Sequence, residues 1–446
     1  MMPNGRLATQ KYHHLHLIAG LVGFLVLSML GGCNSFALPD WLVASRPTPT
    51  LVLPSSPTPV VTQALPISSP TPSGPIVLTI WVPPQFNPDP SKPGGDFLAD
   101  RLEQFKLENP GILINIRVKS LSGPANLLDS LMTTLLAAPD AMPSLVILPR
   151  NMMEAAALKE MVLPLNGLIS LDDEGWYPYA RQLASINDSI YGFPFAGDGL
   201  MLILRPAKTS TPPRTWEELI LWNEPIVFAA ADPKAYLPIM LYQAFGGSLS
   251  DADGHPSLQL TPLTQMLDIF SRAAQQQVFN TSTITIQSES DAWQAYNDMQ
   301  ADAVLTLSSH YLASLPGDSA AIPLPAINPS PVSMLDGWLV CLSDPIPERR
   351  ALAIRLAEFL VDPAFLAEWS QQAGYLPTHS SSLVAWKNQS LRNLLSGILP
   401  NAPIIPDAYL TSSLGPILRD ATIQVLERNQ SPLQAAQDAI NRIGTH

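Results

Sequence analysis

Charged residues are scarce in this chain: Asp, Glu, Lys and Arg make up 14% of its 446 residues, against about 25% in an ordinary soluble domain. The charges are also unbalanced, because 24 Lys and Arg face 37 Asp and Glu and give a formal net charge of −13. Nucleic-acid binding needs Lys and Arg to displace counterions from phosphates. The composition therefore argues against nucleic acid as a partner.

Cysteine is nearly absent as well, with only Cys33 and Cys341, so a disulfide scaffold and a multi-cysteine zinc site are excluded. The sequence has no G-x-S-x-G elbow, Walker A loop, H-E-x-x-H or S-x-x-K motif. Cys341 lies in an apolar strand pattern and is expected to be a buried small hydrophobic residue. We expect no metal, no cofactor and no enzymatic activity.

The N-terminus has the pattern of an export signal. Arg6 and Lys11 precede an almost wholly apolar run from Leu15 to Leu30, which is shorter than the roughly 20 residues of a membrane span and typical of a secretory signal. The ending Gly31-Gly32-Cys33 resembles the lipobox of bacterial lipoproteins. That resemblance implies a signal peptide at 1–32, removed before a lipidated Cys33; the alternative is an uncleaved anchor helix. Either places the rest of the chain outside the cytoplasmic membrane.

A tether follows at 33–75, where Pro, Ser and Thr dominate in repeated Pro-Thr-Pro and Ser-Pro steps. Proline fixes φ and removes N–H donors, so neither helix nor sheet can propagate. An extended segment of this length reaches on the order of 100 Å. We interpret it as a spacer between membrane and body, with a proline-rich docking motif as the alternative.

Alternating strand and helix patterns begin at Ile76. The apolar run at 76–82 predicts a buried strand, the runs at 112–118 and 145–148 predict two further strands, and helical spacing at 97–108 and 127–137 separates them. This order predicts an α/β fold with parallel strands. Further helices are predicted at 215–222, 263–276, 290–299, 347–360, 363–373 and 432–443. Asp251 to Gly254 is expected to form a hairpin turn rather than a calcium loop, since the closing acidic residue is missing.

Six short segments resemble, in order, motifs of the family 1 extracellular solute-binding proteins, the maltose-type receptors of ABC importers. They are Phe105–Ile112, Pro143–Ile147, Tyr191–Ala196 (Y-G-x-P-x-A), Pro212–Leu219 (P-x-T-W-E-E-L), Gly246-Gly247 with Asp253-Gly254, and Gly374–Pro377. Two departures stand out. Leu204-Arg205-Pro206 stands where the family often has Tyr-Asn, and His310 holds a position where it usually has a Trp, a role that Tyr311 can take instead.

The resemblance implies a two-lobed, type II periplasmic-binding-protein-like fold. Each lobe is a mostly parallel sheet flanked by helices, with the ligand cleft between the lobes. We expect the first lobe at 76–193 and 322–361, because 337–343 reads as a return to the first sheet. The second lobe is expected at 194–321 and 362–446.

Ligands of such folds bind at the carboxyl ends of strands, where loops supply polar groups. A sugar needs aromatic platforms for its ring faces and polar side chains for its hydroxyls. The candidates at strand ends and crossovers are Trp81, Arg150, Asn151, Asp198, His310, Tyr311, Trp338 and Tyr375. Core packing is the alternative for Trp81 and Trp338, and a solvated loop for Asp198. Trp216, behind the helix-capping Thr215, is expected to be structural.

These patterns predict a lipid-anchored, monomeric receptor that captures a small solute, foremost a carbohydrate, and delivers it to an ABC transporter permease. The same fold binding another solute, such as a polyamine, or acting as a sensor is the alternative, and an exported enzyme is the third. A ligand-induced melting shift across sugars and polyamines, without turnover, separates them.

The anchor gives a first prediction. Cys33→Ser removes the only sulfur that the lipobox can lipidate, so the protein is expected to leave the membrane fraction while its body stays folded. Cell fractionation measures the release from the membrane, and labelling with a radioactive fatty acid measures the lipidation, each against the wild type. A variant that still carries label would contradict the lipobox interpretation.

Overall fold

The computed structural model describes residues 74–208, 211–222, 224–327 and 333–443, all within one compact unit, Pro70–His446. The predicted signal peptide, Cys33 and the tether up to residue 73 lie outside the described residues. Within the described ranges, every helix is too short or too polar to cross a membrane.

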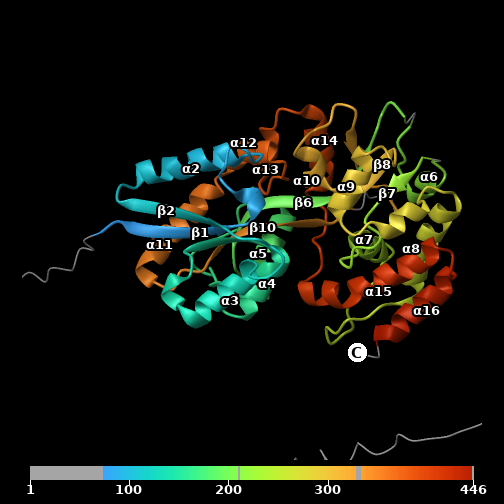
Figure 1. The fold of residues 1–446 in the computed structure, drawn as a ribbon, viewed down its shortest axis with the longest axis horizontal. Helices are drawn as coiled ribbons and strands as arrows, with labels where there is room; N and C mark the ends of the chain where they lie inside the picture. Colours follow the sequence, from blue (N-terminus) through green and yellow to red (C-terminus); the bar gives the residue numbers. More distant parts are fainter. Residues whose placement is uncertain (1–73, 209–210, 223, 328–332, 444–446) are drawn as a thin grey trace, which may run out of the picture. The chain divides into compact units, whose positions relative to one another are not determined.

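One large mixed sheet runs through the described body (Figure 1), with strand order β2-β1-β3-β10-β6-β8-β7 and β9 paired to β6. Its strands are β1 (Ile76–Val82), β2 (Ile112–Val118), β3 (Leu145–Pro149), β6 (Phe193–Leu204), β7 (Ile226–Val227), β8 (Ala303–Leu307), β9 (Ala320–Ile322) and β10 (Leu335–Leu342). A separate hairpin joins β4 (Ser185–Ile186) to β5 (Ser189–Ile190). β1 runs parallel to β2 and β3, and β7 parallel to β8, whereas β6 and β10 run antiparallel to their neighbours.

Strand β6 connects the two ends of this sheet. All twelve of its residues are buried. Its first part pairs with β10, and its second part, from Leu200, pairs with β8 and β9. The stretch where β6 and β10 lie side by side is here called the crossing, and it leaves little space for side chains. A Cβ added at Gly197 would lie 2.3 Å from the hydroxyl oxygen of Tyr179, and one added at Gly337 would lie 2.6 Å from the carbonyl oxygen of Ala196. Only glycine therefore fits at these two positions.

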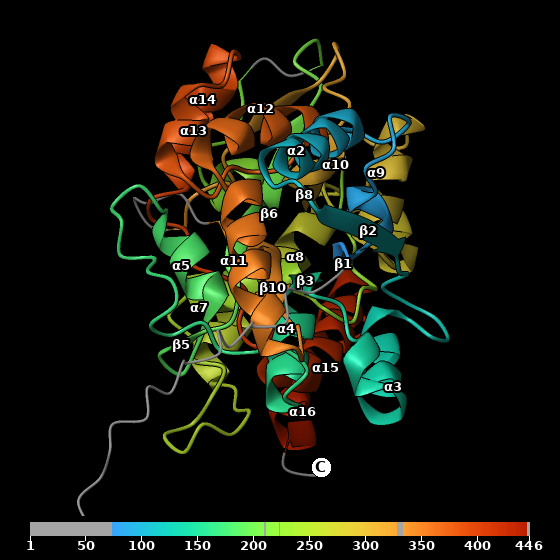
Figure 2. The ribbon, with the colours of Figure 1, turned by 90° about the vertical axis from the view of Figure 1, so that its left-hand side faces the viewer.

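Helices cover both faces of the sheet (Figures 1 and 2). Those that follow the first strands are α2 (Gly95–Glu108), α3 (Leu127–Ala137), α4 (Arg150–Leu158) and α5 (Pro178–Ala184). The middle of the chain forms α6 (Trp216–Ile220), α7 (Tyr236–Ala244), α8 (Leu260–Gln275), α9 (Glu289–Asn297) and α10 (Ser308–Leu312). The last part forms α11 (Pro347–Leu360), α12 (Pro363–Ala373), α13 (Ser380–Val384), α14 (Gln389–Ile398), α15 (Ala408–Leu426) and α16 (Pro432–Ile443). Short 3-10 turns lie at η2 (Pro84–Phe86), η3 (Pro139–Ala141) and η4 (Thr281–Thr285).

Distinct hydrophobic cores form at the two ends of the sheet. At one end, α2, α11 and α12 bury Phe105, Leu356 and Trp369 against β1 and β3. At the other end, α7, α8, α15 and α16 pack together around β8, burying Phe270 and Leu418. The lobe boundaries given above stay a prediction.

Most predicted elements are present. The strands at 76–82 and 112–118 and the helices at 127–137, 347–360, 363–373 and 432–443 match residue for residue. Thr215 caps α6 as expected, accepting from the Glu218 N–H at 3.1 Å. The turn at Asp251 is also confirmed, because Gly254 N–H donates to the Asp251 carbonyl at 3.2 Å. Cys341 is fully buried, and burial raises the pKa of its thiol.

Other elements were not anticipated from the sequence: α4, α5, α7, α10, α13, α14 and α15. The longest of them, α15, contains Pro416 in its interior. Proline lacks the N–H that a helix interior requires, so this segment does not read as a helix.

The strand crossing gives the second prediction. Gly337→Ala is expected to destabilise the protein by about 1–3 kcal/mol, because the new methyl group meets a backbone oxygen that cannot move away. Gly397→Ala in α14 is the matched control, since nothing lies within 4 Å of its Cβ position, and it should stabilise by about 0.5–1 kcal/mol. Urea unfolding midpoints measure both, and equal midpoints would contradict the tight crossing.

Candidate functional site

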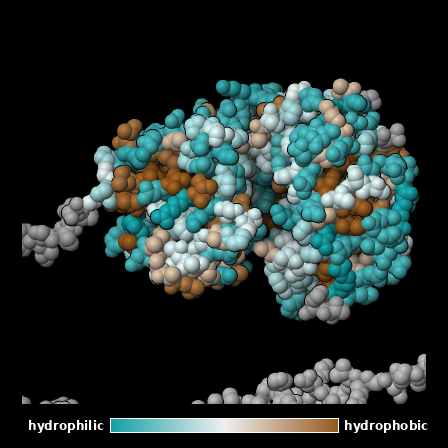
Figure 3. All heavy atoms as spheres, in the orientation of Figure 1, coloured by the Kyte–Doolittle hydropathy of each residue, from teal (hydrophilic) through white to brown (hydrophobic). Residues whose placement is uncertain are grey.

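A cavity of about 330 Å³, here called the central cavity, lies where the first turn of α4, the turn before α7, strand β10 and the start of α15 meet. It is lined by Arg150, Asn151, Glu154, Pro233, Lys234, Tyr236, Asp336, Ile405, Pro406, Ala408, Thr411, Ser412 and Pro416. Its volume is at the lower end of the range of small-molecule sites. Figure 3 shows the surface of the described body hollowed between its two halves.

Arg150 and Asn151 line this cavity because α4 begins directly after β3. The Arg150 guanidinium donates to Glu154 Oε1 at 2.6 Å, to the Leu183 carbonyl at 2.6 Å and to the Gln182 carbonyl. The other Glu154 oxygen accepts from the Ala408 N–H at 2.8 Å, so the pair ties α4 to the start of α15. Arg150 therefore has its charge and donors engaged by protein, whereas the exposed Asn151 amide has its N–H₂ group available for a ligand.

Asp198 lies at the crossing, directly opposite Asp336 in the β6–β10 pairing. Its buried carboxylate accepts from Ser308 Oγ at 2.7 Å, from Ser309 N at 3.0 Å and from Ser309 Oγ at 2.5 Å. These bonds fasten α10 to β6. Loss of Asp198 would leave buried donors unsatisfied, so this residue contributes to the fold whatever its contact with a ligand.

His310 lies on α10 in a hydrogen-bond chain that fixes its tautomer. Thr306 donates its hydroxyl to the Glu289 carbonyl at 3.1 Å, so it accepts from His310 Nδ1 at 3.0 Å, and Nε2 is left to accept from Ser290 Oγ at 3.1 Å. Burial lowers the pKa of His310, which favours the neutral ring. The neighbouring Tyr311 is buried and donates to the Ser319 carbonyl at 3.3 Å.

Trp338 and Tyr375 come together around Phe86. Each ring centroid lies 5.1 Å from that of Phe86, and both side chains are half-buried. Burial, assisted by Asp198, raises the pKa of Tyr375. Trp81 lies elsewhere, in a buried cluster with Lys119 Nζ 4.7 Å from its ring centroid, and it does not line the central cavity.

Three carboxyl groups near the cavity were missed from the sequence. Asp336 lines the cavity, and burial, together with Asp198, raises its pKa to about 6. Burial, together with Asp232, raises the pKa of Glu289 to about 8. Asp232 is itself buried, and burial raises its pKa. Of the three, only Asp336 could have been identified from the sequence, because it is an acidic residue inside an otherwise apolar strand pattern.

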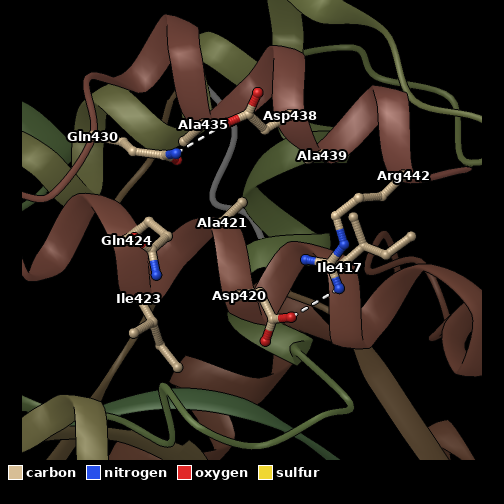
Figure 4. Close-up of a pocket in the computed structure, with 10 residues that line it drawn as sticks. All are labelled: Ile417, Asp420, Ala421, Ile423, Gln424, Gln430, Ala435, Asp438, Ala439 and Arg442. Atoms are coloured by element: carbon tan, nitrogen blue, oxygen red, sulfur yellow. Dashed lines mark hydrogen bonds and ion pairs between the residues drawn. The ribbon is translucent and has the colours of Figure 1, made fainter.

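Two other features do not join this site. Asp251, Asp253 and His255 bring possible metal-ligand atoms within 4.8 Å of one another, but all three are exposed on the hairpin turn. A second cavity of about 250 Å³ lies between α15 and α16 (Figure 4), where Arg442 reaches Asp420 at 2.9 Å and Gln430 reaches Asp438 at 2.9 Å. The first pair joins the two helices and the second joins the loop between them to α16, and none of the predicted site residues lines this cavity.

The sequence matches the family model described as bacterial extracellular solute-binding protein over residues 101–391, more than half of the chain. No curated protein matches the sequence.

Many solved structures share the fold. The sugar-binding protein MalE from Xanthomonas citri superposes with a TM-score of 0.67 at 18% identity, covering 83% of this chain and 96% of that one. The cyclic α-maltosyl-1,6-maltose binding protein from Arthrobacter globiformis superposes with a TM-score of 0.65 at 17% identity, covering 83% of this chain and 99% of that one. An ABC transporter solute-binding protein from Thermotoga lettingae, bound to α-D-tagatose, superposes with a TM-score of 0.64 at 17% identity, covering 83% of this chain and 99% of that one. The expected two-lobed binding-protein fold is confirmed.

The half-buried Glu289, whose Oε2 atom is enclosed by protein, gives the third prediction. Its pKa is raised from 4.5 to about 8, so its neutral form fits the folded state, and the stability that this group contributes is complete below pH 4.5 and is lost as the pH rises through 8. This loss amounts to at most about 5 kcal/mol. Glu289→Gln is expected to flatten the pH dependence of urea unfolding between pH 4.5 and 8. The exposed Glu368→Gln serves as control, and a profile unchanged from wild type in Glu289→Gln would contradict the assignment.

Proposed function

We propose, from the premise that the chain belongs to the bacterial extracellular solute-binding proteins, that it captures a small carbohydrate in the central cavity and delivers it to the permease of an ABC importer. The observation that carries this proposal is the cavity itself, of ligand size and lined by polar groups from elements at both ends of the sheet. The sugar ligands named for the similarly folded proteins support the choice of solute class.

The proposed capture depends on two lobes. Residues 76–193 with 322–361 would form the first, and 194–321 with 362–446 the second, although the packing of α12 on α2 favours moving 363–373 to the first. Asn151 would then face Lys234 and Tyr236 across the cavity. Closure of the lobes around a solute would exclude water and strengthen each polar contact.

Within the cavity, Asn151 and Asp336 are placed to exchange hydrogen bonds with hydroxyl groups, and the Tyr236 ring offers an apolar face. Trp338, Tyr375 and His310 would extend this surface along the β6–β10 crossing. Arg150, Asp198, Trp81 and Tyr311 would act through the positions of these groups, because their own side chains are engaged or buried. The proposal needs no cofactor, metal or catalytic group.

The receptor would act outside the cytoplasmic membrane as a monomer, held to the membrane by lipidated Cys33 and the proline-rich tether. A reach on the order of 100 Å lets the body meet solute and permease without leaving the surface.

The test is ligand-induced stabilisation. A sugar that binds at 100 times its dissociation constant should raise stability by about 2.7 kcal/mol, and thermal melting with maltose, tagatose, glucose and glucosamine measures it. Asn151→Ala should weaken the best ligand about 2- to 10-fold by calorimetric titration, because it removes a hydrogen bond worth about 0.5–1.5 kcal/mol.

Asn393→Ala is the matched control, since that asparagine is exposed on α14 and does not line the cavity. The Asn393→Ala variant should bind the same sugar with the affinity of the wild type. The absence of any melting shift with these sugars, or equal losses in both variants, would overturn the proposal.

A further inference from the structure

We infer that Glu154 is a positioning residue, which holds two walls of the central cavity together by fastening α4 to the first turn of α15. Helix α4 packs against β3 and β10, whereas α15 belongs to the core that α7, α8 and α16 form at the other end of the sheet. A bond between α4 and α15 therefore joins the two ends of the sheet. The inference rests on the proposed function and deepens it, because it names a residue that controls closure around the solute.

The Glu154 side chain is fixed from the α4 side. The residue is 7% exposed, and its Oε1 atom accepts from the Arg150 guanidinium at 2.6 Å. That guanidinium also donates to two carbonyls in the last turn of α5, those of Leu183, at 2.6 Å, and of Gln182. The position of the carboxylate is thus set by α4 and α5 together, and its Oε2 atom is left to reach another segment.

The segment that Oε2 reaches is the start of α15, where the Ala408 N–H donates to it at 2.8 Å. The first N–H groups of a helix have no partner within the helix. Asp407 caps one of them by accepting from the Leu410 N–H at 2.9 Å, and Glu154 caps another. A carboxylate also suits the positive end of the helix dipole, and hydrogen bonds to ionised acceptors are stronger than neutral ones. This contact therefore holds α15 firmly against α4.

The chain just before α15 has a second attachment, at the crossing. The Leu335 N–H of β10 donates to the Pro403 carbonyl at 2.9 Å, and the Ile405 N–H donates to the Leu335 carbonyl at 2.8 Å. Helix α15 is therefore held at β10 through residues 403–405 and at α4 through Glu154. When the bond to Glu154 is released, the attachment at β10 remains as a pivot, about which α15 swings away from α4.

The bond also forms part of the cavity wall. Glu154 and Ala408 both line the central cavity, together with Asn151 on α4 and Thr411 on α15. A solute that touches both helices favours the arrangement in which the bond is made, so the bond and the solute stabilise one another. When the bond is lost, part of the ligand-free protein leaves the binding-competent arrangement, and the apparent affinity falls by that fraction.

The decisive variant is Ala408→Pro. Proline is favoured at the first residue of a helix, where the helix does not use the missing N–H. Asp407 already has the extended ψ of 161° that a residue before proline requires. The substitution therefore removes the donor to Glu154 and leaves α15 intact.

Leu260→Pro is the matched control. Leu260 is also the first residue of its helix, α8, and it follows Gln259, which has an extended ψ of 133°. Among the described residues, its N–H has no hydrogen-bond partner. Glu154→Gln is a second variant, which breaks the bond to α15 from the other side.

Pulsed electron paramagnetic resonance measures the opening on the full-length protein, as the distance between spin labels at Lys159→Cys, just after α4, and Gln434→Cys on α16, both exposed. Cys33→Ser in the same chain leaves these two sites to label, because Cys341 is buried. Without sugar, Ala408→Pro and Glu154→Gln are expected to shift the distances to longer values, whereas Leu260→Pro should keep the distances of the unsubstituted chain.

Calorimetric titration with maltose, tagatose, glucose and glucosamine measures the effect on binding. For each sugar that binds, Ala408→Pro and Glu154→Gln should raise the dissociation constant at least about threefold, and Leu260→Pro should leave it unchanged.

Unchanged distances in both Ala408→Pro and Glu154→Gln would overturn the inference, whatever the melting temperatures, because a bond with a merely structural role lowers stability without opening the cavity. Longer distances without a loss of affinity would overturn the link between this bond and the solute. If none of the four sugars binds, the proposed function is overturned, and longer distances in the sugar-free variants still support the role of Glu154.

Discussion

The close crossing of β6 and β10 is the constraint on which the rest of the structure depends. Gly337 lets the two backbones approach, Gly197 leaves room for the Tyr179 hydroxyl, and the register of the pair places Asp198 opposite Asp336. β6 then continues to β8, so a single strand belongs to the cores at both ends of the sheet. The position of the central cavity follows, because elements from the two ends meet beside this strand.

The same crossing explains why two acids face each other in the sheet. A strand that is buried along its whole length normally reads as an apolar run, yet β6 carries Asp198 in its middle. The serine donors at the start of α10 satisfy that carboxylate fully. Among the described residues, Asp336 has no such set of donors and accepts only from its neighbour's N–H. Of these two facing acids, Asp198 therefore stabilises the fold through its hydrogen bonds, and Asp336 lines the cavity.

Sequence patterns predicted what depends on local order. The strand at 76–82 and the helix at 127–137 were found because apolar spacing and stop signals are local. Helix α4 was missed because it begins with no linker after β3, and Arg150 and Asn151, predicted to lie at a strand end, form its first two residues and line the central cavity. Asp232 and Glu289 could not be found, because their burial arises only when distant segments pack together. Trp81 ends up in a hydrophobic cluster for the same reason.

The proline in α15 has a consequence for the chemistry of the cavity. Pro416 has no N–H, so the carbonyl of Ser412, one turn earlier, cannot accept the usual helical hydrogen bond from it. Both residues lie on the cavity wall. The helix thus lacks one backbone hydrogen bond at the edge of the binding space, and replacing Pro416 by any other residue would restore the missing N–H donor.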